Sequence, residues 1–461
     1  MSLQFITGNS GNGKTKYLFN RIVKEAKANP RDNYLVIVPE QFTMQTQRQL
    51  VDLSENKAIM NIDVLSFKRL AYRVFDELGI TNLTVLEETG KNLVLRKLAA
   101  QEADKLGVIG RNLNRIGYIS EVKSLLSELV QYNISPEELG RYIVSGRLSD
   151  TLSDKLKDVL VLYEAFEKFM KDKYITAEEI LNVLCNVAEE SAILRNSVIA
   201  FDEFTGFTPI QNQLIKKLFV ISKKIYVTLT IDCREDIFKS RGMQELFDMP
   251  KRTVKSLTEM AAFYGIEVEE PIILDKNYRL AENEELSFME QQLFRKRRCS
   301  FKKVPKHIHI DCLRDPKQEL TKIARRINEL VRNENLRYRD IAIVTGDVNI
   351  YAGYVREIFD KYNIPYFIDA TQEILFHPFI EFIRSIPDIA AQNFSADAVF
   401  RFLRCGFSEL LDSEIDVLEN YVLACGVRGK SAWDKKWVRL PKHKAGYDIE
   451  LLNQSREYIM E

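Results

Sequence analysis

The feature that most constrains this chain is a glycine-rich loop near its N-terminus. Residues 3–7 form a short apolar run that predicts a buried strand, and residues 19–26 carry apolar side chains at helical spacing. The eight residues that fit GxxxxGK[ST] at every fixed position are Gly8, Asn9, Ser10, Gly11, Asn12, Gly13, Lys14 and Thr15. A strand, this loop and a helix, in that order, predict a phosphate-binding P-loop in an α/β fold.

The residue types in this loop suit a nucleoside triphosphate. Glycines allow backbone N–H groups to turn toward phosphate oxygens, and the helix N-terminus adds the positive end of its dipole. We expect Lys14 to contact the β- and γ-phosphates of ATP and the Thr15 hydroxyl to hold Mg²⁺. The alternative is a glycine-rich turn that ends in a solvated lysine, but motif and flanking pattern agree on the P-loop.

A P-loop needs an acidic element on a neighbouring strand, and the apolar run 198–201 leads directly into one. We expect Asp202 to complete the Mg²⁺ shell and Glu203 to orient the attacking water. A strand that ends in two solvated carboxylates is the alternative. The P-loop earlier in the chain favours the metal site.

Composition limits the rest of the interpretation. The 66 basic and 66 acidic residues cancel, so nucleic-acid contacts must come from local patches. The six cysteines have no CxxC spacing, which argues against a zinc site or a disulfide framework. We expect no membrane contact, because no apolar stretch approaches the roughly 20 residues of a membrane span, and a cytoplasmic location because no signal sequence is visible.

Hydrophobic periodicity divides the chain into alternating blocks. The α/β pattern of the first residues gives way to a helical pattern from about residue 85 to residue 194. Strand-like apolar runs return at 198–201 and 225–231. A second α/β block without a P-loop shows candidate strands at 308–310, 341–344 and 366–368, and the chain is helical after about residue 377. This order predicts a first domain interrupted by a helical insertion.

Four segments carry a resemblance to a known family. Residues 38–43 read Val-Pro-Glu-Gln-Phe-Thr, and residues 65–67 read Leu-Ser-Phe. Residues 202–211 read Asp-Glu-Phe-Thr-Gly-Phe-Thr-Pro-Ile-Gln, and residues 274–279 read Leu-Asp-Lys-Asn-Tyr-Arg. With the P-loop, these segments resemble the UvrD/Rep-type helicases and, more closely, the AddB subunits of bacterial AddAB helicase-nucleases.

The resemblance implies an α/β fold class with two RecA-like P-loop-type domains and helical insertions. ATP is then expected between the two domains, with Arg279 reaching the γ-phosphate across the cleft. The implied segments are 1–84 and 195–280 for the first RecA-like domain, 85–194 for its helical insertion, 281–376 for the second RecA-like domain, and 377–461 for the start of a further helical insertion, apparently truncated.

The resemblance also implies partners and activities. It predicts a bacterial cytoplasmic subunit that pairs with an AddA-like helicase-nuclease subunit, acts on double-strand DNA ends and single strands, and takes part in Chi recognition for recombinational repair. In that family the nuclease motif and an iron–sulfur cluster lie in a C-terminal part, and no residue of this chain is assigned to them.

Three departures from the helicase pattern keep a second function open. Thr205 and Gly206 stand where these helicases carry Gln-Asp, and residues 230–233 replace the expected Gly-Asp-x-x-Gln element. The strand at residues 3–7 leaves no room for the upstream adenine-reading glutamine. The alternative is a helicase-derived DNA-binding scaffold whose nucleotide site is regulatory. A P-loop kinase, a third possibility, leaves residues 277–279 unexplained.

DNA contacts are expected at two places. By resemblance, Ser66 and Phe67 touch single-stranded DNA, although a phenylalanine after a strand is commonly a core residue. The densest basic run could neutralise phosphates or form a solvated linker, and it comprises Arg295, Lys296, Arg297 and Arg298. Trp433 and Trp437, among lysines, could form a stacking platform or one face of a core helix.

Overall fold

The computed structural model forms two compact units, Met1–His309 and Ile310–Glu461, and each is described by itself. None of the helices that it describes is long and apolar enough to cross a membrane. The described residues are 1–81, 84–108, 110, 116–145, 148–171, 173–295, 299–370, 374–441 and 447–460.

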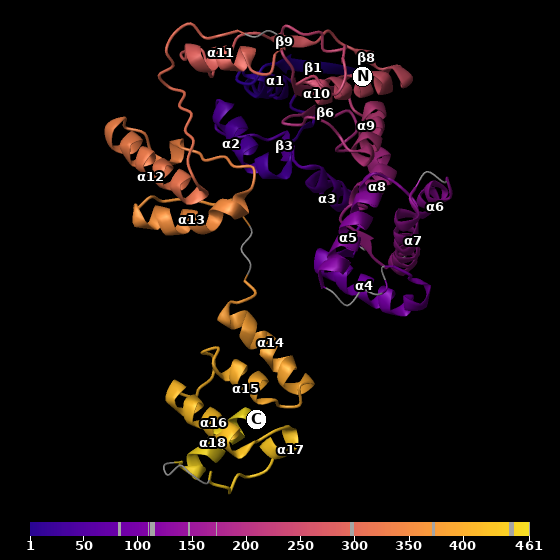
Figure 1. The fold of residues 1–461 in the computed structure, drawn as a ribbon. Helices are drawn as coiled ribbons and strands as arrows, with labels where there is room; N and C mark the ends of the chain where they lie inside the picture. The colour runs from indigo at the N-terminus through magenta and orange to yellow at the C-terminus, as the bar shows by residue number, and fades with distance from the viewer. Residues whose placement is uncertain are drawn as a thin grey trace. The chain divides into compact units, whose positions relative to one another are not determined.

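A parallel sheet forms the centre of the first unit (Figure 1). Its strand order is β3-β2-β6-β7-β1-β8, and β9 also pairs with β1. Apolar runs buried on both faces are typical of parallel strands between two helix layers. The strands are β1 (Ser2–Gly8), β2 (Tyr34–Ile37), β3 (Ile62–Leu65), β6 (Val198–Phe201), β7 (Lys224–Thr230), β8 (Glu267–Val268) and β9 (Ile272–Leu274).

Helices cover both faces of this sheet, because successive strand residues point to opposite sides. Ile6 and Val36 pack in one core with α1 (Lys14–Ala28) and α2 (Thr43–Leu53), which follows the short 3₁₀ turn at Glu40–Phe42. The residues next to them along the same strands belong to a second core, on the other face of the sheet. Its helices are α3 (Phe67–Leu78), α8 (Ile180–Val187), α9 (Pro209–Ile221) and α10 (Asp248–Phe263).

A helical region with its own core interrupts the sheet between α3 and β6. Leu95, Val122 and Leu162 are buried in this core. Helix α8 follows the region and packs in the sheet core instead. The elements of the region are β4 (Val85–Leu86), α4 (Glu88–Gln101), the 3₁₀ turn Ala103–Lys105, α5 (Ile116–Gln131), α6 (Pro136–Val144), α7 (Asp150–Met170) and β5 (Ile175–Thr176), which pairs with β4.

The second unit begins after α11 (Glu284–Gln292), the last helix described in the first unit. Helices α12 (Pro316–Asn333) and α13 (Val348–Lys361), with a 3₁₀ turn at Tyr338–Asp340 between them, share a small core around Leu320 and Phe359.

The strands expected at 308–310, 341–344 and 366–368 do not form in the described structure. These segments lack strand pairing, and apolar residues such as Val344 and Phe367 are 93% and 89% exposed. An apolar run marks a strand only where neighbouring strands complete its hydrogen bonds. The strand predictions were wrong for this structure, and a second RecA-like domain stays a prediction.

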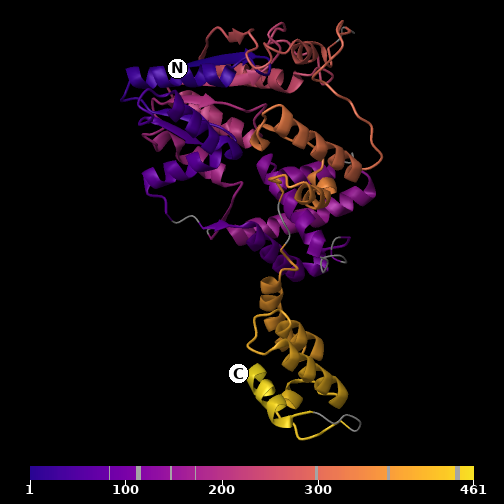
Figure 2. The same ribbon diagram turned by 90° about the vertical axis from the view of Figure 1, so that its left-hand side faces the viewer.

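The last helices of the second unit gather into one bundle, drawn in orange to yellow in Figure 2. Trp433 is fully buried, Trp437 is 6% exposed, and their ring centroids lie 5.2 Å apart. Both tryptophans are therefore core residues, although they do not share one helix face, because Trp437 lies beyond the helix that ends at Trp433. The helices are α14 (Pro378–Ala391), α15 (Ala396–Leu403), α16 (Asp412–Cys425), α17 (Lys430–Trp433) and α18 (Ile449–Met460).

A Trp433→Ala substitution should destabilise this bundle by about 3–5 kcal/mol, because it removes a buried indole and leaves a cavity. The measurement is urea unfolding followed by circular dichroism. Leu440→Ala is the control, since Leu440 is 54% exposed and a surface change should stay within about 0.5 kcal/mol. An unchanged midpoint in Trp433→Ala, together with weaker binding of single-stranded DNA, would favour the platform interpretation instead.

Candidate nucleotide-binding site

The glycine-rich loop joins β1 to α1 in the geometry that phosphate binding requires. Gly11 and Gly13 adopt φ angles of 88° and 78°, and Gly13 is the N-cap of α1. Such left-handed angles are readily accessible to glycine. The Lys14 ammonium donates hydrogen bonds to the carbonyl oxygens of Gly8 and Asn9 at 3.1 and 3.0 Å. These two hydrogen bonds hold the ammonium of Lys14, the residue expected to contact phosphate, against the loop.

Strand order brings the two predicted carboxylates to this loop. The Thr15 hydroxyl lies 3.4 Å from Asp202 Oδ1 and 3.3 Å from Glu203 Oε1. On the neighbouring strand, the Thr228 hydroxyl donates a hydrogen bond to Asp202 Oδ1. No sequence motif marks Thr228, although the parallel pairing of β6 and β7 places it beside the end of β6.

Asp202 fits the role of a metal ligand. Its side chain is 1% exposed, and its Oδ2 atom has no hydrogen-bond partner in the described structure. Burial raises the pKa of Asp202, and the charge of Glu203 acts in the same direction, whereas the hydrogen bond from Thr228 opposes them. A hard divalent cation with oxygen ligands would satisfy this buried carboxylate. Thr15 and Asp202 supply the hydroxyl and carboxylate oxygens that Mg²⁺ prefers.

Glu203 adopts a backbone conformation that is uncommon for a residue with a side chain. Its φ angle is 63°, in the left-handed region. Backbone strain of this kind costs on the order of 1–3 kcal/mol and persists where the surroundings enforce it. Here it turns the chain directly after β6, and Glu203 lines the same cavity as the loop.

The segment 277–279 lies directly on the loop. Asn277 Nδ2 donates to the Ser10 carbonyl at 3.0 Å, and the backbone N–H groups of Tyr278 and Arg279 donate to the Gly11 carbonyl at 3.0 and 3.3 Å. A Cβ atom at Gly11 would lie 2.8 Å from Asn277 Oδ1 and 2.9 Å from Arg279 Cβ. This close approach, together with the positive φ, explains the glycine.

Arg279 belongs to the same unit as the loop. Its reach to the γ-phosphate across a cleft between two domains stays a prediction. Strand β9 pairs with β1 up to Leu274 opposite Gly8, so the chain that follows β9 runs over the loop. The sequence showed the motif but not the pairing that sets its position.

These groups converge on one cavity of about 750 Å³. Burial lowers the pKa of Lys14, and the charge of Arg279 adds to this effect, whereas Asp202, Glu203 and Glu290 oppose it. Two cations and two carboxylates beside a glycine-rich loop suit a polyphosphate with a divalent cation. Exposed Tyr278 also lines this cavity, and the sequence motif assigned it no role.

Comparison with known proteins shows the family of this chain. A family profile described as "ADDB, N-terminal" matches residues 5–290, which is more than half of the chain. The chain belongs to the AddB N-terminal family. The resemblance recognised from the sequence segments is confirmed.

Three curated relatives are named as B subunits of an ATP-dependent helicase/deoxyribonuclease. The protein of Lachnoclostridium phytofermentans is 38% identical over all of this chain and 40% of its own length. That of Clostridium acetobutylicum is 34% identical over 95% of this chain and 38% of its own length, and that of Clostridioides difficile is 33% identical over 100% and 40%. The chain thus spans about 40% of the length of these AddB relatives.

The two residues expected to touch single-stranded DNA in this AddB family member are buried here. Ser66 is 5% exposed, accepts a hydrogen bond from the Arg69 N–H as the N-cap of α3, and donates one to Glu40. Phe67 is 7% exposed and stacks on Phe201 with ring centroids 5.8 Å apart. Neither side chain is open to a base in this structure. Their contact with DNA stays a prediction.

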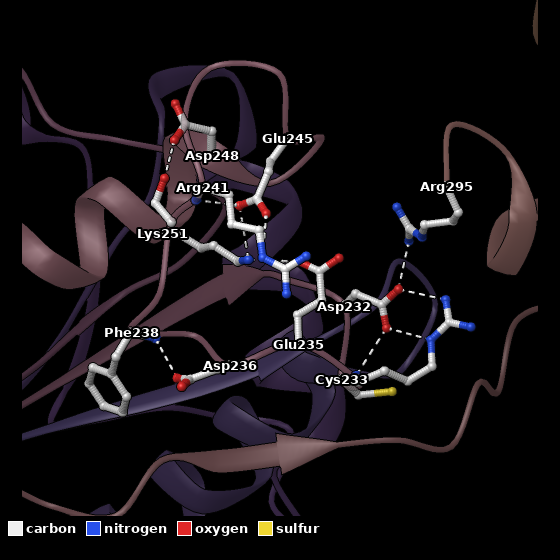
Figure 3. A network of polar contacts seen from close by, with 12 residues as sticks. Asp232, Cys233, Glu235, Asp236, Phe238, Arg241, Glu245, Asp248, Lys251 and Arg295 are labelled. Carbon is white, nitrogen blue, oxygen red and sulfur yellow. Dashed lines mark hydrogen bonds and ion pairs between the residues drawn. The ribbon is translucent and has the colours of Figure 1, made fainter. Parts of the chain in front are cut away.

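The basic run is described only at Arg295, because Lys296, Arg297 and Arg298 lie outside the described residues. Arg295 is 13% exposed and pairs with Asp232 at 2.9 Å (Figure 3). Its guanidinium also lies 4.8 Å from the centre of the Phe247 ring. In this structure Arg295 is engaged inside the protein, and its contact with DNA phosphate stays a prediction.

Substitution of Gly11 by alanine should weaken ATP binding at least about tenfold, because the new Cβ would collide with the segment 277–279. Gly79→Ala is the matched control. Gly79 has a φ of 68°, but a Cβ there would meet nothing within 4 Å, so that variant carries only the left-handed strain of about 1 kcal/mol. Titration calorimetry with Mg·ATP compares the two. Equal affinities would show that the close approach is unimportant.

Proposed function

We propose that this chain binds ATP with Mg²⁺ as the N-terminal part of an AddB-like helicase/exonuclease subunit that processes double-strand DNA breaks for recombinational repair. The observation that carries this proposal is the convergence of Lys14, Asp202 and Arg279 on one cavity. Membership of the AddB N-terminal family supports the wider role.

The chain's own residues divide the work of phosphoryl transfer. Lys14 would hold the β- and γ-phosphates, and Thr15 with Asp202 would hold Mg²⁺, which would neutralise negative charge on the phosphates. Glu203 accepts a hydrogen bond from the attacking water and so orients it. Arg279 lies on the loop beside Gly11, where its charge stabilises the transferring phosphoryl group.

The proposed partners follow from the family. The relatives are named as one subunit of a larger enzyme, which supports a heterodimer with an AddA-like subunit, and the word deoxyribonuclease in their name supports DNA as the substrate. Chi recognition belongs to the assembled heterodimer in this proposal. The nuclease residues and the iron–sulfur cluster are assigned to the part of the longer relatives that this chain does not span.

Two observations favour the alternative of a scaffold with a regulatory nucleotide site. Thr205 and Gly206 replace the helicase Gln-Asp pair. Asp232, at the place of the helicase Gly-Asp-x-x-Gln element, is 1% exposed and forms ion pairs with Arg234 and Arg295. A side chain held in two ion pairs is not free to respond to a γ-phosphate.

ATP binding and steady-state hydrolysis, with and without single-stranded DNA, test the proposal. Lys14→Ala should weaken ATP binding about 10- to 100-fold, because a charge-assisted contact to phosphate contributes roughly 1.5–3 kcal/mol. Glu203→Gln should keep binding but lower turnover about 10²- to 10⁴-fold, since it removes the group that orients water.

The outcomes separate the two functions. Turnover that is stimulated by DNA and lost in both variants identifies a working motor. Binding without turnover, lost only in Lys14→Ala, identifies the scaffold. Unchanged ATP affinity in Lys14→Ala would contradict the nucleotide site itself.

A further inference from the structure

Asn9 occupies a position that the P-loop motif leaves variable, yet its side chain is almost fully enclosed. It is 4% exposed, its Nδ2 atom donates to Glu290 Oε1 at 2.8 Å, and its Oδ1 atom accepts from the Cys233 N–H at 2.9 Å. One side-chain amide therefore ties the phosphate loop to the chain after β7 and to α11. Only a group that donates and accepts at once can make both contacts.

The backbone of the same residue touches the phosphate-binding lysine. The Asn9 carbonyl accepts hydrogen bonds from the Lys14 ammonium at 3.0 Å and from the Asn12 N–H at 3.2 Å. When Lys14 turns toward a phosphate, the hydrogen bonding of this carbonyl changes. This carbonyl belongs to Asn9, the residue whose side chain holds α11.

A second attachment fixes the same segment. Asp232 pairs with Arg295 at 2.9 Å and with Arg234 at 2.6 Å (Figure 3 shows the Asp232–Arg295 pair). Arg234 Nη2 also donates to the carbonyl of Gln291 at 3.0 Å. Burial would raise the pKa of Asp232, but the hydrogen bonds from Arg234 and the charge of Arg295 lower it below the ordinary value. Asp232 is thus held ionised, and segment 290–295 has two polar anchors.

We propose that Asn9 is a positioning residue that couples occupancy of the phosphate loop to the docking of α11, with Glu290 as its partner. The inference rests on the proposed binding of ATP. Helix α11 is the last helix described before the boundary at His309, so its docking orders the final part of the first unit. Coupling of this kind is reciprocal, and nucleotide must stabilise α11 as much as docked α11 favours nucleotide.

Hydrogen–deuterium exchange of the α11 amides, with and without saturating Mg·ADP, tests the coupling. In the unaltered chain, nucleotide should slow exchange of residues 284–292 about 10- to 100-fold, the range expected for one hydrogen bond to a charged group. Glu290→Ala should abolish that dependence and weaken nucleotide binding within the same range. Glu290→Gln should retain most of both, because its amide oxygen can still accept from Asn9.

Glu284→Ala is the matched control, since Glu284 lies on the same helix and pairs with Lys303 instead. It should leave the nucleotide dependence intact. If Glu290→Gln and Glu290→Ala behave alike, the charge of Glu290 acts on Lys14 through space and the positioning role is wrong. If nucleotide binds but exchange in α11 is unchanged, the coupling is wrong. A failure to bind nucleotide at all contradicts the proposed function instead.

Discussion

The parallel pairing of β1 with its neighbours is the constraint on which the site depends. Gly8 pairs with Thr230 of β7 on one side and with Leu274 of β9 on the other. Because parallel strands end at the same edge of a sheet, the loop after β1, the carboxylates after β6 and the segment after β9 must meet there. The hydrophobic cores on both faces hold that register, since a slip of one residue would turn Phe5 and Ile6 to the wrong sides.

The sequence predicted the parts of the site that depend on local geometry. The P-loop motif determines the turn, the lysine and the hydroxyl within eight residues, and Asp202 follows a strand that is apolar throughout. The placement of Arg279 beside Gly11 and the support of Asp202 by Thr228 depend on which strands pair, which no local pattern encodes. The burial of Phe67 depends on aromatic partners more than 130 residues away in the chain. For the same reason, apolar runs such as 341–344 did not suffice to predict strands.

The same edge of the sheet carries features of a motor and of a fixed scaffold. The loop, Thr15, Asp202 and Glu203 fit the proposed ATP-hydrolysing site, whereas Asp232 is held by two arginines and Phe67 is enclosed by other rings. Asn9 links the first set to the second, because it contacts both the Lys14 ammonium and the chain beside Asp232. A nucleotide bound here would therefore act on the position of α11 whether or not it is hydrolysed.

A crystal structure of the chain with Mg²⁺ and a non-hydrolysable ATP analogue would test the central claim most directly. The account predicts the β-phosphate within the loop of residues 8–15, the Lys14 ammonium on the β- and γ-phosphate oxygens, and Mg²⁺ between Thr15 and Asp202 Oδ2. It also predicts the Arg279 guanidinium near the γ-phosphate. A nucleotide bound elsewhere, or a loop that stays empty at saturating analogue with Lys14 still on the Gly8 and Asn9 carbonyls, would contradict it.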